Sequence, residues 1–268
     1  MLLLVDLDGV VYRGSQPVPG MPELLARRAA AGDIIVYVTN NSRWHRSQYR
    51  ERLEGMGAPV APDSIVTAAR ATALALASRP RPPRCVMVFG GPGLARELRD
   101  AGLRTVATSE RGLAAGPDAL VVGVDFSLSF ERLSLAADAV RAGATFVATN
   151  RDPVYPVPER LMAGAGSMVA AVIVASGREP DLVVGKPEPG LFRAAAEAVG
   201  VAVGDAVVIG DGLGTDILAA HRVGARSILM LTGVSTREHV ALLPESERPT
   251  RVAQDARELD AILDQLVD

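Results

Sequence analysis

Short apolar runs alternate along this chain with longer stretches in which apolar residues recur at helical spacing. The runs that we interpret as buried strands are 2–7, 34–39, 85–89, 119–124, 144–148, 182–184, 205–210 and 227–232. The stretches that we interpret as helices are 22–31, 43–55, 63–78, 93–101, 130–142, 168–175, 188–199, 215–223 and one from about 255. This alternation is typical of parallel strands joined by crossover helices, so we predict an α/β protein with a Rossmann-like parallel sheet.

Two breaks in the pattern indicate a second domain. The sequence RPRPPR at 79–84 interrupts it, and SGREP, rich in helix-breaking residues, precedes its resumption. We therefore predict one domain inserted in another: a core formed by residues 1–78 and 181–268, and an inserted α/β domain formed by residues 79–180.

The balance of charge argues against two broad classes of partner. The 268 residues carry a formal net charge of -3, so nothing indicates binding to nucleic acid or to an anionic membrane. The first residues lack a signal-peptide pattern and no apolar run is long enough to span a bilayer, so we expect a soluble cytoplasmic protein. The single cysteine, Cys85, lies in an apolar run and is predicted to be a buried thiol.

Two acidic clusters follow predicted strands. Asp6 and Asp8 stand in VDLDGV at the end of the first strand, and Asp211 and Asp216 stand in GDGLGTDI after the strand 205–210. Ligands of open α/β sheets bind outside the carboxyl ends of the strands, and carboxylate oxygens suit Mg²⁺ better than zinc. The alternatives are an Asp-Gly turn for the first pair and helix-start electrostatics for Asp216.

Polar residues follow two further strands. TNNS at 39–42 precedes a predicted helix and offers a hydroxyl and amides to an anion, although for this motif alone an Asn-rich turn with Ser42 as N-cap is favoured. The chain has three asparagines, and all lie in such loops: Asn40 and Asn41 here, and Asn150 in TNRD. TNRD opens the segment 149–166, which we predict to be irregular.

Lys186 is the only lysine in the chain, because the other 27 of the 28 basic residues are arginine. It lies in VVGKPEP, between a predicted strand and a predicted helix. Lysine presents a compact point charge where arginine presents a broad planar fork. A crowded anionic site is one explanation of this residue, and a solvated loop lysine is the other.

Three further residues or motifs have simple structural interpretations. Asp63 is the predicted N-cap of the helix 63–78. His45 is predicted to lie on a surface helix, since no second histidine stands at a metal-binding or triad spacing from it. GPG at 91–93 lacks the lysine of a phosphate loop and is predicted to open a helix.

These motifs, in this order, resemble those of the haloacid dehalogenase (HAD) phosphatase superfamily. DLDGVVYRG, TNNS, TNRD…GAGSMVAA, GKPEP and GDGLGTDI are most similar to the branch with a large α/β cap inserted after the second motif, the type IIA or C2 cap. The resemblance implies a Mg²⁺-dependent phosphomonoester hydrolase that acts on a small phosphorylated metabolite, such as a sugar, glycolate or glycerol phosphate. It covers nearly the whole chain.

The resemblance also implies roles for the charged residues. Asp6 is the nucleophile that forms an aspartyl-phosphate, and Asp8 is the general acid/base. Asp6, the backbone carbonyl of Asp8 and Asp211 bind Mg²⁺, and Asp216 supports the metal shell. Lys186 contacts both the phosphate and the nucleophile. These roles agree with the chemistry, because a carboxylate attacks phosphorus readily only when cations neutralise the phosphate.

The polar residues receive roles in binding. Thr39 and the Asn40 amide hold phosphate oxygens, and Asn41 belongs to the substrate side of the same loop. Asn150 and Asp152 lie in the cap loop that the resemblance places toward the substrate. The cap's own sheet offers an edge for a possible homodimer.

The chain departs from the branch at Gly212 and Gly214, where larger polar or acidic residues are common, and at Ala163, where proline is frequent. Gly212 and Gly214 suggest one alternative, a non-catalytic protein that binds phosphometabolites. A phosphotransferase or mutase of the same superfamily is another. A dehalogenase fits less well, because dehalogenation needs no metal and the carboxylates indicate one.

Overall fold

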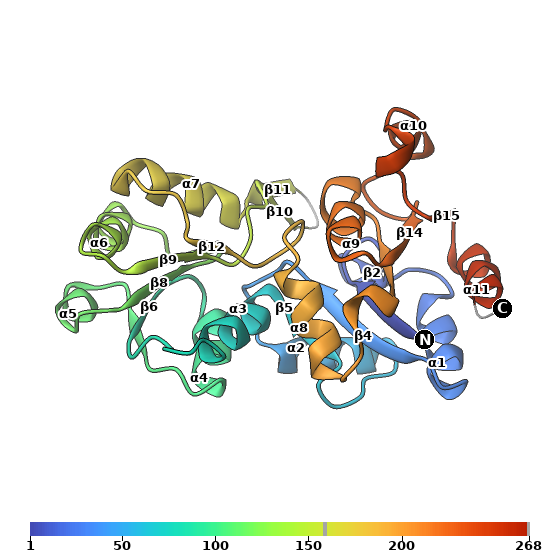
Figure 1. Cartoon of the computed structure of the whole chain (residues 1–268), viewed down its shortest axis with the longest axis horizontal. Helices are drawn as coiled ribbons and strands as arrows, with labels where there is room; N and C mark the ends of the chain where they lie inside the picture. Colours follow the sequence, from blue (N-terminus) through green and yellow to red (C-terminus); the bar gives the residue numbers. More distant parts are fainter. Residues whose placement is uncertain (158–159, 267–268) are drawn as a thin grey trace. The chain divides into compact units, whose positions relative to one another are not determined.

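The chain forms two compact units, each with its own parallel sheet (Figure 1). The computed structural model describes residues 1–157 and 160–266. We name the unit Met1–Thr39, Ser47–Val66 and Lys186–Asp268 the core unit, and the unit Asn40–Arg46 and Thr67–Gly185 the cap unit. The predicted α/β class, with a Rossmann-like core and an inserted α/β cap, is confirmed, while the predicted domain boundaries stay a prediction.

The core unit is built on a sheet of order β15-β14-β13-β1-β4-β5. Its strands are β1 (Leu2–Asp6), β4 (Ile34–Thr39), β5 (Ile65–Thr67), β13 (Ala206–Gly210), β14 (Arg226–Met230) and β15 (Arg251–Ala253). Its helices are α1 (Met21–Ala30), α2 (Arg46–Gly55), α8 (Gly190–Ala198), α9 (Leu218–Val223), α10 (Arg237–Ala241) and α11 (Ala256–Gln265). Every residue of β1 is buried, which is expected of a central strand covered on both faces.

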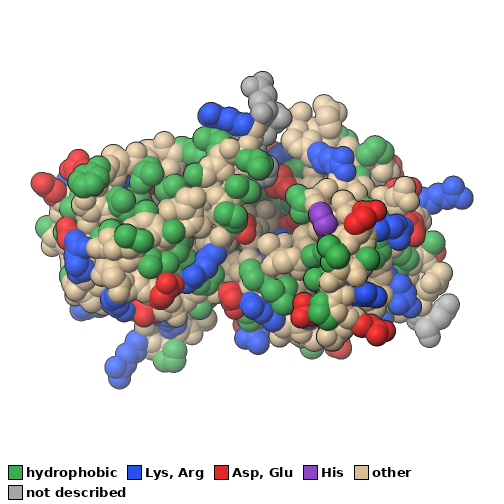
Figure 2. Space-filling view, turned by 90° about the horizontal axis from the view of Figure 1, so that it is seen from above, with side chains coloured by type: hydrophobic (Ala, Val, Ile, Leu, Met, Phe, Trp, Pro, Cys, Tyr) green, Lys and Arg blue, Asp and Glu red, His purple; other side chains and the backbone are tan. Residues whose placement is uncertain are grey.

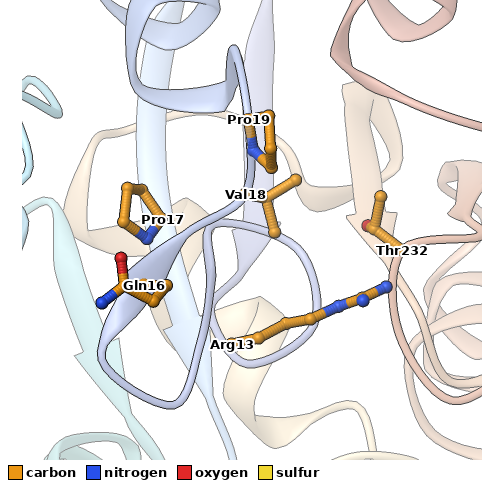
Figure 3. A pocket seen from close by; sticks show the side chains of 6 residues that line it. All are labelled: Arg13, Gln16, Pro17, Val18, Pro19 and Thr232. Carbon is orange, nitrogen blue, oxygen red and sulfur yellow. The ribbon is translucent and has the colours of Figure 1, made fainter.

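Short elements complete the core unit. The hairpin β2 (Tyr12–Arg13) and β3 (Gln16–Pro17) follows β1, and single turns occur at η1 (Val203–Asp205), η2 (Leu213–Ile217) and η3 (Glu245–Glu247). A cavity of about 320 Å³ lies beside the hairpin (Figure 3). It is lined by Arg13, Gln16, Pro17, Val18, Pro19 and Thr232.

The cap unit is built on a sheet of order β12-β9-β8-β6-β7, whose pairs are all parallel. Its strands are β6 (Val86–Phe89), β7 (Thr105–Ala107), β8 (Ala119–Val122), β9 (Thr145–Ala148) and β12 (Leu182–Val183), with a separate hairpin of β10 (Val154–Val157) and β11 (Arg160–Ala163). Its helices are α3 (Ala68–Ala77), α4 (Pro92–Asp100), α5 (Glu110–Ala114), α6 (Phe130–Arg141) and α7 (Ala165–Ser176). Met87, Phe89 and Phe146 form the centre of its apolar core.

The structure corrects two local predictions. Asp63 is not a helix N-cap: the β-branched run Ile65–Thr67 forms β5, and Thr67 caps α3 by accepting the N–H of Arg70 at 3.0 Å. The segment 149–166 is not wholly irregular, because β10 and β11 pair as an antiparallel hairpin. Residues 158 and 159 of that segment lie outside the described residues.

The predictions for GPG at 91–93 and for Cys85 are confirmed. Pro92 opens α4 after Gly91, as GPG predicted, and the Cys85 thiol is buried. Basic and acidic side chains are interspersed on the face drawn in Figure 2, in line with the small net charge. Within residues 1–157 and 160–266, no helix combines the length and the apolar composition needed to cross a membrane.

Candidate active site

Strand register brings the predicted acidic residues of the core unit together. Asp6 pairs with Val38 across β1 and β4, and Val5 pairs with Ile209 across β1 and β13. Thr39 and Asp211 therefore follow at the same edge of the sheet as Asp6. This edge carries the carboxyl ends of three parallel strands, where open α/β sheets bind ligands.

Lys186 is buried between two of these carboxylates. Its Nζ lies 2.7 Å from Oδ1 of Asp6 and 2.7 Å from Oδ1 of Asp216, and its side chain is 3% exposed. The two carboxylates raise the pKa of Lys186 even though burial opposes its charge, so the ammonium stays protonated. The lone lysine is thus an internal cation and not a solvated loop residue.

Asp216 is held from both sides. Besides Lys186, it accepts the N–H of Gly212 at 3.2 Å and the hydroxyl of Thr215 at 3.1 Å, both on Oδ2. The turn η2 that carries it is a π-helical turn, which begins directly after Gly212. Asp211 is fixed separately, because its Oδ2 accepts the N–H of Val234 at 2.8 Å.

Glycines leave the space that these carboxylates occupy. A Cβ on Gly233 would lie 1.7 Å from Oδ2 of Asp211, and one on Gly9 would lie 2.3 Å from the same atom. A Cβ on Gly210 would lie 2.2 Å from the Cβ of Asp216. Gly9 also has a φ of +82°, a left-handed conformation that side chains disfavour. The main chain therefore approaches the acidic cluster as closely as only glycine allows.

The cluster has the donor set of a divalent-cation site. One carboxylate oxygen from each of Asp6, Asp211 and Asp216 lies within 4.8 Å of the others, and all three residues are buried. One ammonium cannot neutralise three carboxylates. An oxygen-only set of this kind fits Mg²⁺ or Ca²⁺.

The pKa values of the carboxyl groups reflect burial first and, for Asp6 and Asp211, this excess of negative charge. Burial raises the pKa of Asp6 well above its usual value, with contributions from Asp216 and Asp211 that Lys186 opposes. Burial and Asp216 raise the pKa of Asp211 to about 6, against the N–H of Val234. Burial also raises the pKa of Asp8, against the charges of Arg52 and Lys186. A bound cation would favour the charged form of each.

Sequence reasoning missed residues that shape this site. The guanidinium of Arg52 stacks over the ring of Tyr12, with Cζ 3.6 Å from the ring centroid, and its charge acts on Asp8. Tyr12 is fully buried and packs in the apolar core of its unit. Gly233 and Val234 stand in LTGVS after β14, where no charged residue drew notice. Their position just after the carboxyl end of a predicted strand could have identified them as part of the site.

The cap unit brings together the remaining predicted residues. The side chain of Asn40 donates to both carboxylate oxygens of Asp152, at 3.1 and 3.0 Å, and Nδ2 of Asn150 donates to the carbonyl of Asn40 at 2.6 Å. Nδ2 of Asn41 donates to the hydroxyl of Tyr155 at 3.1 Å. Two predicted loops, TNNS and TNRD, therefore form one hydrogen-bonded cluster.

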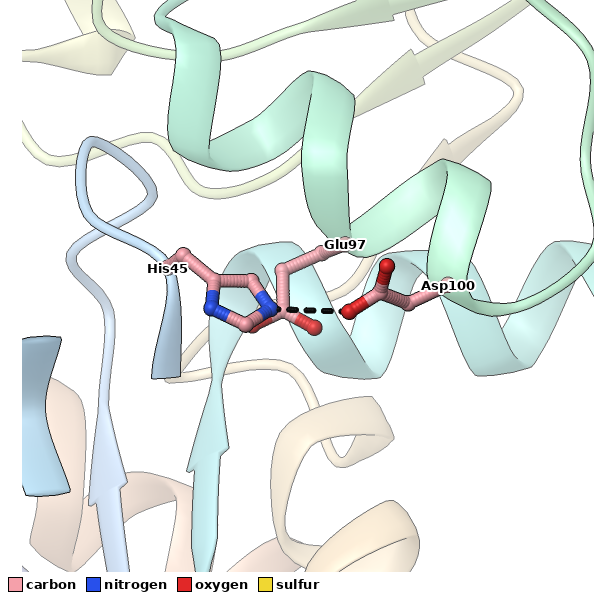
Figure 4. Close-up of side chains that lie close together, drawn as sticks. All are labelled: His45, Glu97 and Asp100. Atoms are coloured by element: carbon pink, nitrogen blue, oxygen red, sulfur yellow. Dashed lines mark hydrogen bonds and ion pairs between the residues drawn. The ribbon is translucent and has the colours of Figure 1, made fainter. Parts of the chain in front are cut away.

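The structure also corrects the predictions for Ser42 and His45. Ser42 is no N-cap, since α2 begins at Arg46; its hydroxyl instead accepts from the N–H of Val124 at 3.4 Å and bonds to Thr149. His45 is not on a surface helix: it is buried, and its Nε2 lies 2.9 Å from Oδ2 of Asp100 (Figure 4).

Comparison with known families supports the interpretation of these motifs. Residues 3–104 match a family described as haloacid dehalogenase-like hydrolase, and residues 183–259 match one described as HAD-hydrolase-like. Chronophin from Homo sapiens is 41% identical over 245 residues, which cover 88% of this chain and 82% of that protein. D-glycerol 3-phosphate phosphatase from Mycobacterium tuberculosis is 37% identical over 260 residues, which cover 96% and 70%.

Solved structures agree over nearly the whole chain. The p-nitrophenyl phosphatase from Archaeoglobus fulgidus has a TM-score of 0.88 at 33% identity and covers 97% of this chain and 98% of its own. A glycerol phosphate phosphatase from Mycobacterium tuberculosis, in complex with magnesium, has a TM-score of 0.87 at 36% identity, with 96% and 75% covered. It has also been solved in complex with calcium.

The raised pKa of Asp211 predicts a pH-dependent response to Mg²⁺. A carboxyl with a raised folded-state pKa contributes stability that is full below its unfolded value near 4 and lost as the pH rises through about 6. We expect Mg²⁺ to raise the Tm more at pH 8 than at pH 5, because the cation replaces the proton. Thermal melts in EDTA and in Mg²⁺ at both pH values measure this; an equal or larger increment at pH 5 would contradict it.

The crowding at Gly233 predicts that a single methyl group weakens the metal site. Gly233→Ala places a Cβ 1.7 Å from Oδ2 of Asp211, so that carboxylate must move and lose its bond to Val234. We expect Mg²⁺ affinity, measured by calorimetry, to fall at least about tenfold. Gly214→Ala is the matched control, since no atom of the residues that the structure describes lies within 4 Å of a Cβ there. Equal affinities for the two variants would refute the steric argument.

Proposed function

Because this chain belongs to the HAD-like hydrolases of type IIA and is a phosphatase for small phosphorylated substrates, we propose that it hydrolyses phosphomonoesters with Mg²⁺ through an aspartyl-phosphate. The substrate class is a small metabolite such as a sugar, glycolate or glycerol phosphate. Relatives named for D-glycerol 3-phosphate and for acid sugar phosphatase activity support this class.

The observation that carries the proposal is the ion pair of Lys186 with Asp6. The ammonium lies on Oδ1 of Asp6 at 2.7 Å, and within the described residues no donor bonds to Oδ2 of that carboxylate. One oxygen is thus held while the other keeps the lone pairs of a nucleophile. The same ammonium supplies positive charge where an incoming phosphate would need it.

The reaction that we propose has two steps. Oδ2 of Asp6 attacks phosphorus, the ester P–O bond breaks, and Asp8 gives its proton to the departing alkoxide. Asp8 then takes a proton from water, whose oxygen attacks phosphorus and releases inorganic phosphate and the Asp6 carboxylate. The raised pKa of Asp8 suits it to the first role, since a protonated carboxyl is needed at the start.

Asp6, Asp211 and the backbone carbonyl of Asp8 are the residues that we propose to hold Mg²⁺, with Asp216 as their support. The ion supplies positive charge that lowers the repulsion between the carboxylates and a phosphate dianion. Two hydrogen bonds and Lys186 already engage Asp216, which fits a supporting position better than a direct one.

Thr39 and the Asn40 amide are the proposed phosphate contacts, and Asn41, Asn150 and Asp152 the proposed substrate-side residues. Since the side chain of Asn40 bonds to Asp152, we assign its phosphate contact to the main-chain N–H. The hydroxyl, amide and carboxylate groups of this cluster suit a hydroxylated substrate. The predicted homodimer stays a prediction.

A phosphate-release screen tests the function. Small phosphoesters, including sugar, glycolate and glycerol phosphates and 4-nitrophenyl phosphate, are assayed with Mg²⁺ and with EDTA. We expect Mg²⁺-dependent release that Asp6→Asn abolishes with the fold intact by circular dichroism, because an amide is a poor nucleophile. Normal turnover by Asp6→Asn would reject the nucleophile. Transfer of phosphate to an added alcohol in place of water would favour a phosphotransferase.

The buried position of Lys186 predicts that arginine cannot replace it. A planar guanidinium is broader than the ammonium that lies 2.7 Å from two carboxylates, so Lys186→Arg should displace one of them. We expect kcat/KM for 4-nitrophenyl phosphate to fall at least about tenfold. Arg222→Lys, an exposed change at a residue that contacts Pro187 and Glu188, is the control and should stay within about twofold. Near-full activity of Lys186→Arg would remove the argument for an ammonium.

A further inference from the structure

The segment Asn40–Arg46 connects two elements of the core unit but packs as part of the cap unit. It follows β4, which ends at Thr39, and it precedes Ser47, where the core unit resumes. Three glycines of the cap unit lie against it. A Cβ would lie 2.7 Å from Oδ1 of Asn40 if added to Gly185, 2.7 Å from Oγ of Ser42 if added to Gly123, and 2.3 Å from the carbonyl of Arg43 if added to Gly93. The main chain of the cap unit thus forms a close-fitting seat for this segment.

Polar contacts fix the first end of the segment in that seat. Asn150 donates to the carbonyl of Asn40 at 2.6 Å, and Asn40 donates to Asp152 at 3.0 Å. These bonds hold the carbonyl and the side chain of Asn40, the residue whose main-chain N–H is the proposed phosphate contact.

Glu97 of α4 fixes the other end. Its side chain is fully buried, and its Oε1 accepts the main-chain N–H of Arg46 at 2.8 Å. Its Oε2 forms an ion pair with the guanidinium of the same arginine, which also reaches Oδ2 of Asp100 at 3.2 Å. A buried carboxylate is tolerated only when charge and hydrogen bonds satisfy it, so Glu97 and Arg46 hold each other in place.

His45, Glu97 and Asp100 are residue types that bind metals, but their carboxylates are already engaged by donors of the protein. One ligand atom from each of His45, Glu97 and Asp100 lies within 4.8 Å of the others (Figure 4). Arg46 already supplies donors to both carboxylates, and His45 bonds to Asp100. A metal ion would have to displace the guanidinium of Arg46, so the cluster is better explained as a set of contacts that hold the segment Asn40–Arg46 in place.

We propose that Glu97 is a positioning residue for substrate binding: through Arg46 it holds the segment Asn40–Arg46 so that the Asn40 amide is fixed for the phosphate. The inference rests on the proposed function, because it assigns a phosphate contact to Asn40. Glu97 itself does not touch the substrate. A substitution of Glu97 frees the Arg46 end of the segment. It leaves Asp6, Asp8 and Lys186 in place, so we expect it to weaken phosphate binding and not the chemical steps.

Glu97→Gln tests the inference. The amide oxygen still accepts the N–H of Arg46, but the charge that holds the guanidinium is lost. We expect the KM for 4-nitrophenyl phosphate and the inhibition constant of inorganic phosphate to rise together by about tenfold, with kcat within about twofold. A merely structural role would lower the Tm without this split between KM and kcat.

Asp118→Asn is the matched control. Asp118 also accepts a main-chain N–H, that of Arg84 at 2.7 Å, and faces the guanidinium of the same arginine, but it lies outside the segment's seat. We expect its KM and inhibition constant to stay within about twofold of wild type. Equal effects of Glu97→Gln and Asp118→Asn would overturn the inference, as would an unchanged KM in Glu97→Gln.

A double-mutant cycle with Arg46→Gln gives a second measure. If Glu97 acts through Arg46, the two changes in KM are not additive, whereas additive changes count against the inference. Should Glu97→Gln fail to fold, Arg46→Gln alone carries the comparison: it removes the guanidinium that pairs with Glu97, and an unchanged KM there rejects the inference. If the wild-type protein releases no phosphate from any ester, the proposed function itself is rejected. Failure of the proposed function can therefore be told apart from failure of the inference about Glu97.

Discussion

The ammonium of Lys186, enclosed by Asp6 and Asp216, is the contact on which the acidic site depends. Three carboxylates at one edge of a parallel sheet repel each other, and burial removes the water that would screen them. One fixed cation stabilises part of that charge and leaves an excess of negative charge at the site. Burial, and after it the neighbouring carboxylates, raise the pKa values of Asp6 and Asp211, and the same carboxylates raise the pKa of Lys186. Attraction for a cation is therefore built into the fold and not added by surface charge.

Close main-chain approach is the second constraint, and it recurs in both units. Gly9 and Gly233 give Asp211 its space, and Gly93, Gly123 and Gly185 give the segment Asn40–Arg46 its seat. At each of these glycines, a Cβ would overlap a polar atom of Asp211 or of the segment, so any other residue would displace that atom. This explains how Gly212 and Gly214 are accommodated: the N–H of Gly212 bonds to Asp216, and Gly214 faces open space. The structure gives no reason to treat either glycine as a loss of the site.

Much of the fold followed from local pattern. The strands β1, β4 and β13 and the helices α1, α4 and α6 were predicted within a few residues, because buried parallel strands are continuous apolar runs and their crossover helices are amphipathic. The errors were of a different kind. The strand β10 contains a proline, Pro156, and β11 is mostly exposed, so this hairpin lacked the pattern of a buried strand. Asp63 precedes a three-residue edge strand that a helical pattern concealed, and His45 is buried by partners more than 50 residues away in the sequence.

The sequence by itself determined the α/β alternation, the order of the motifs and the residue types at the strand ends, since each depends on neighbours within a few positions. It also marked Lys186, because a single ammonium among 27 guanidiniums is visible without coordinates. Only the tertiary structure decided that this ammonium bridges Asp6 and Asp216, 180 and 30 residues away, and that Glu97 fastens Arg46, 51 residues away. The physical reason is the range of the interactions: propensity and periodicity act along the chain, whereas ion pairing and close packing act through space.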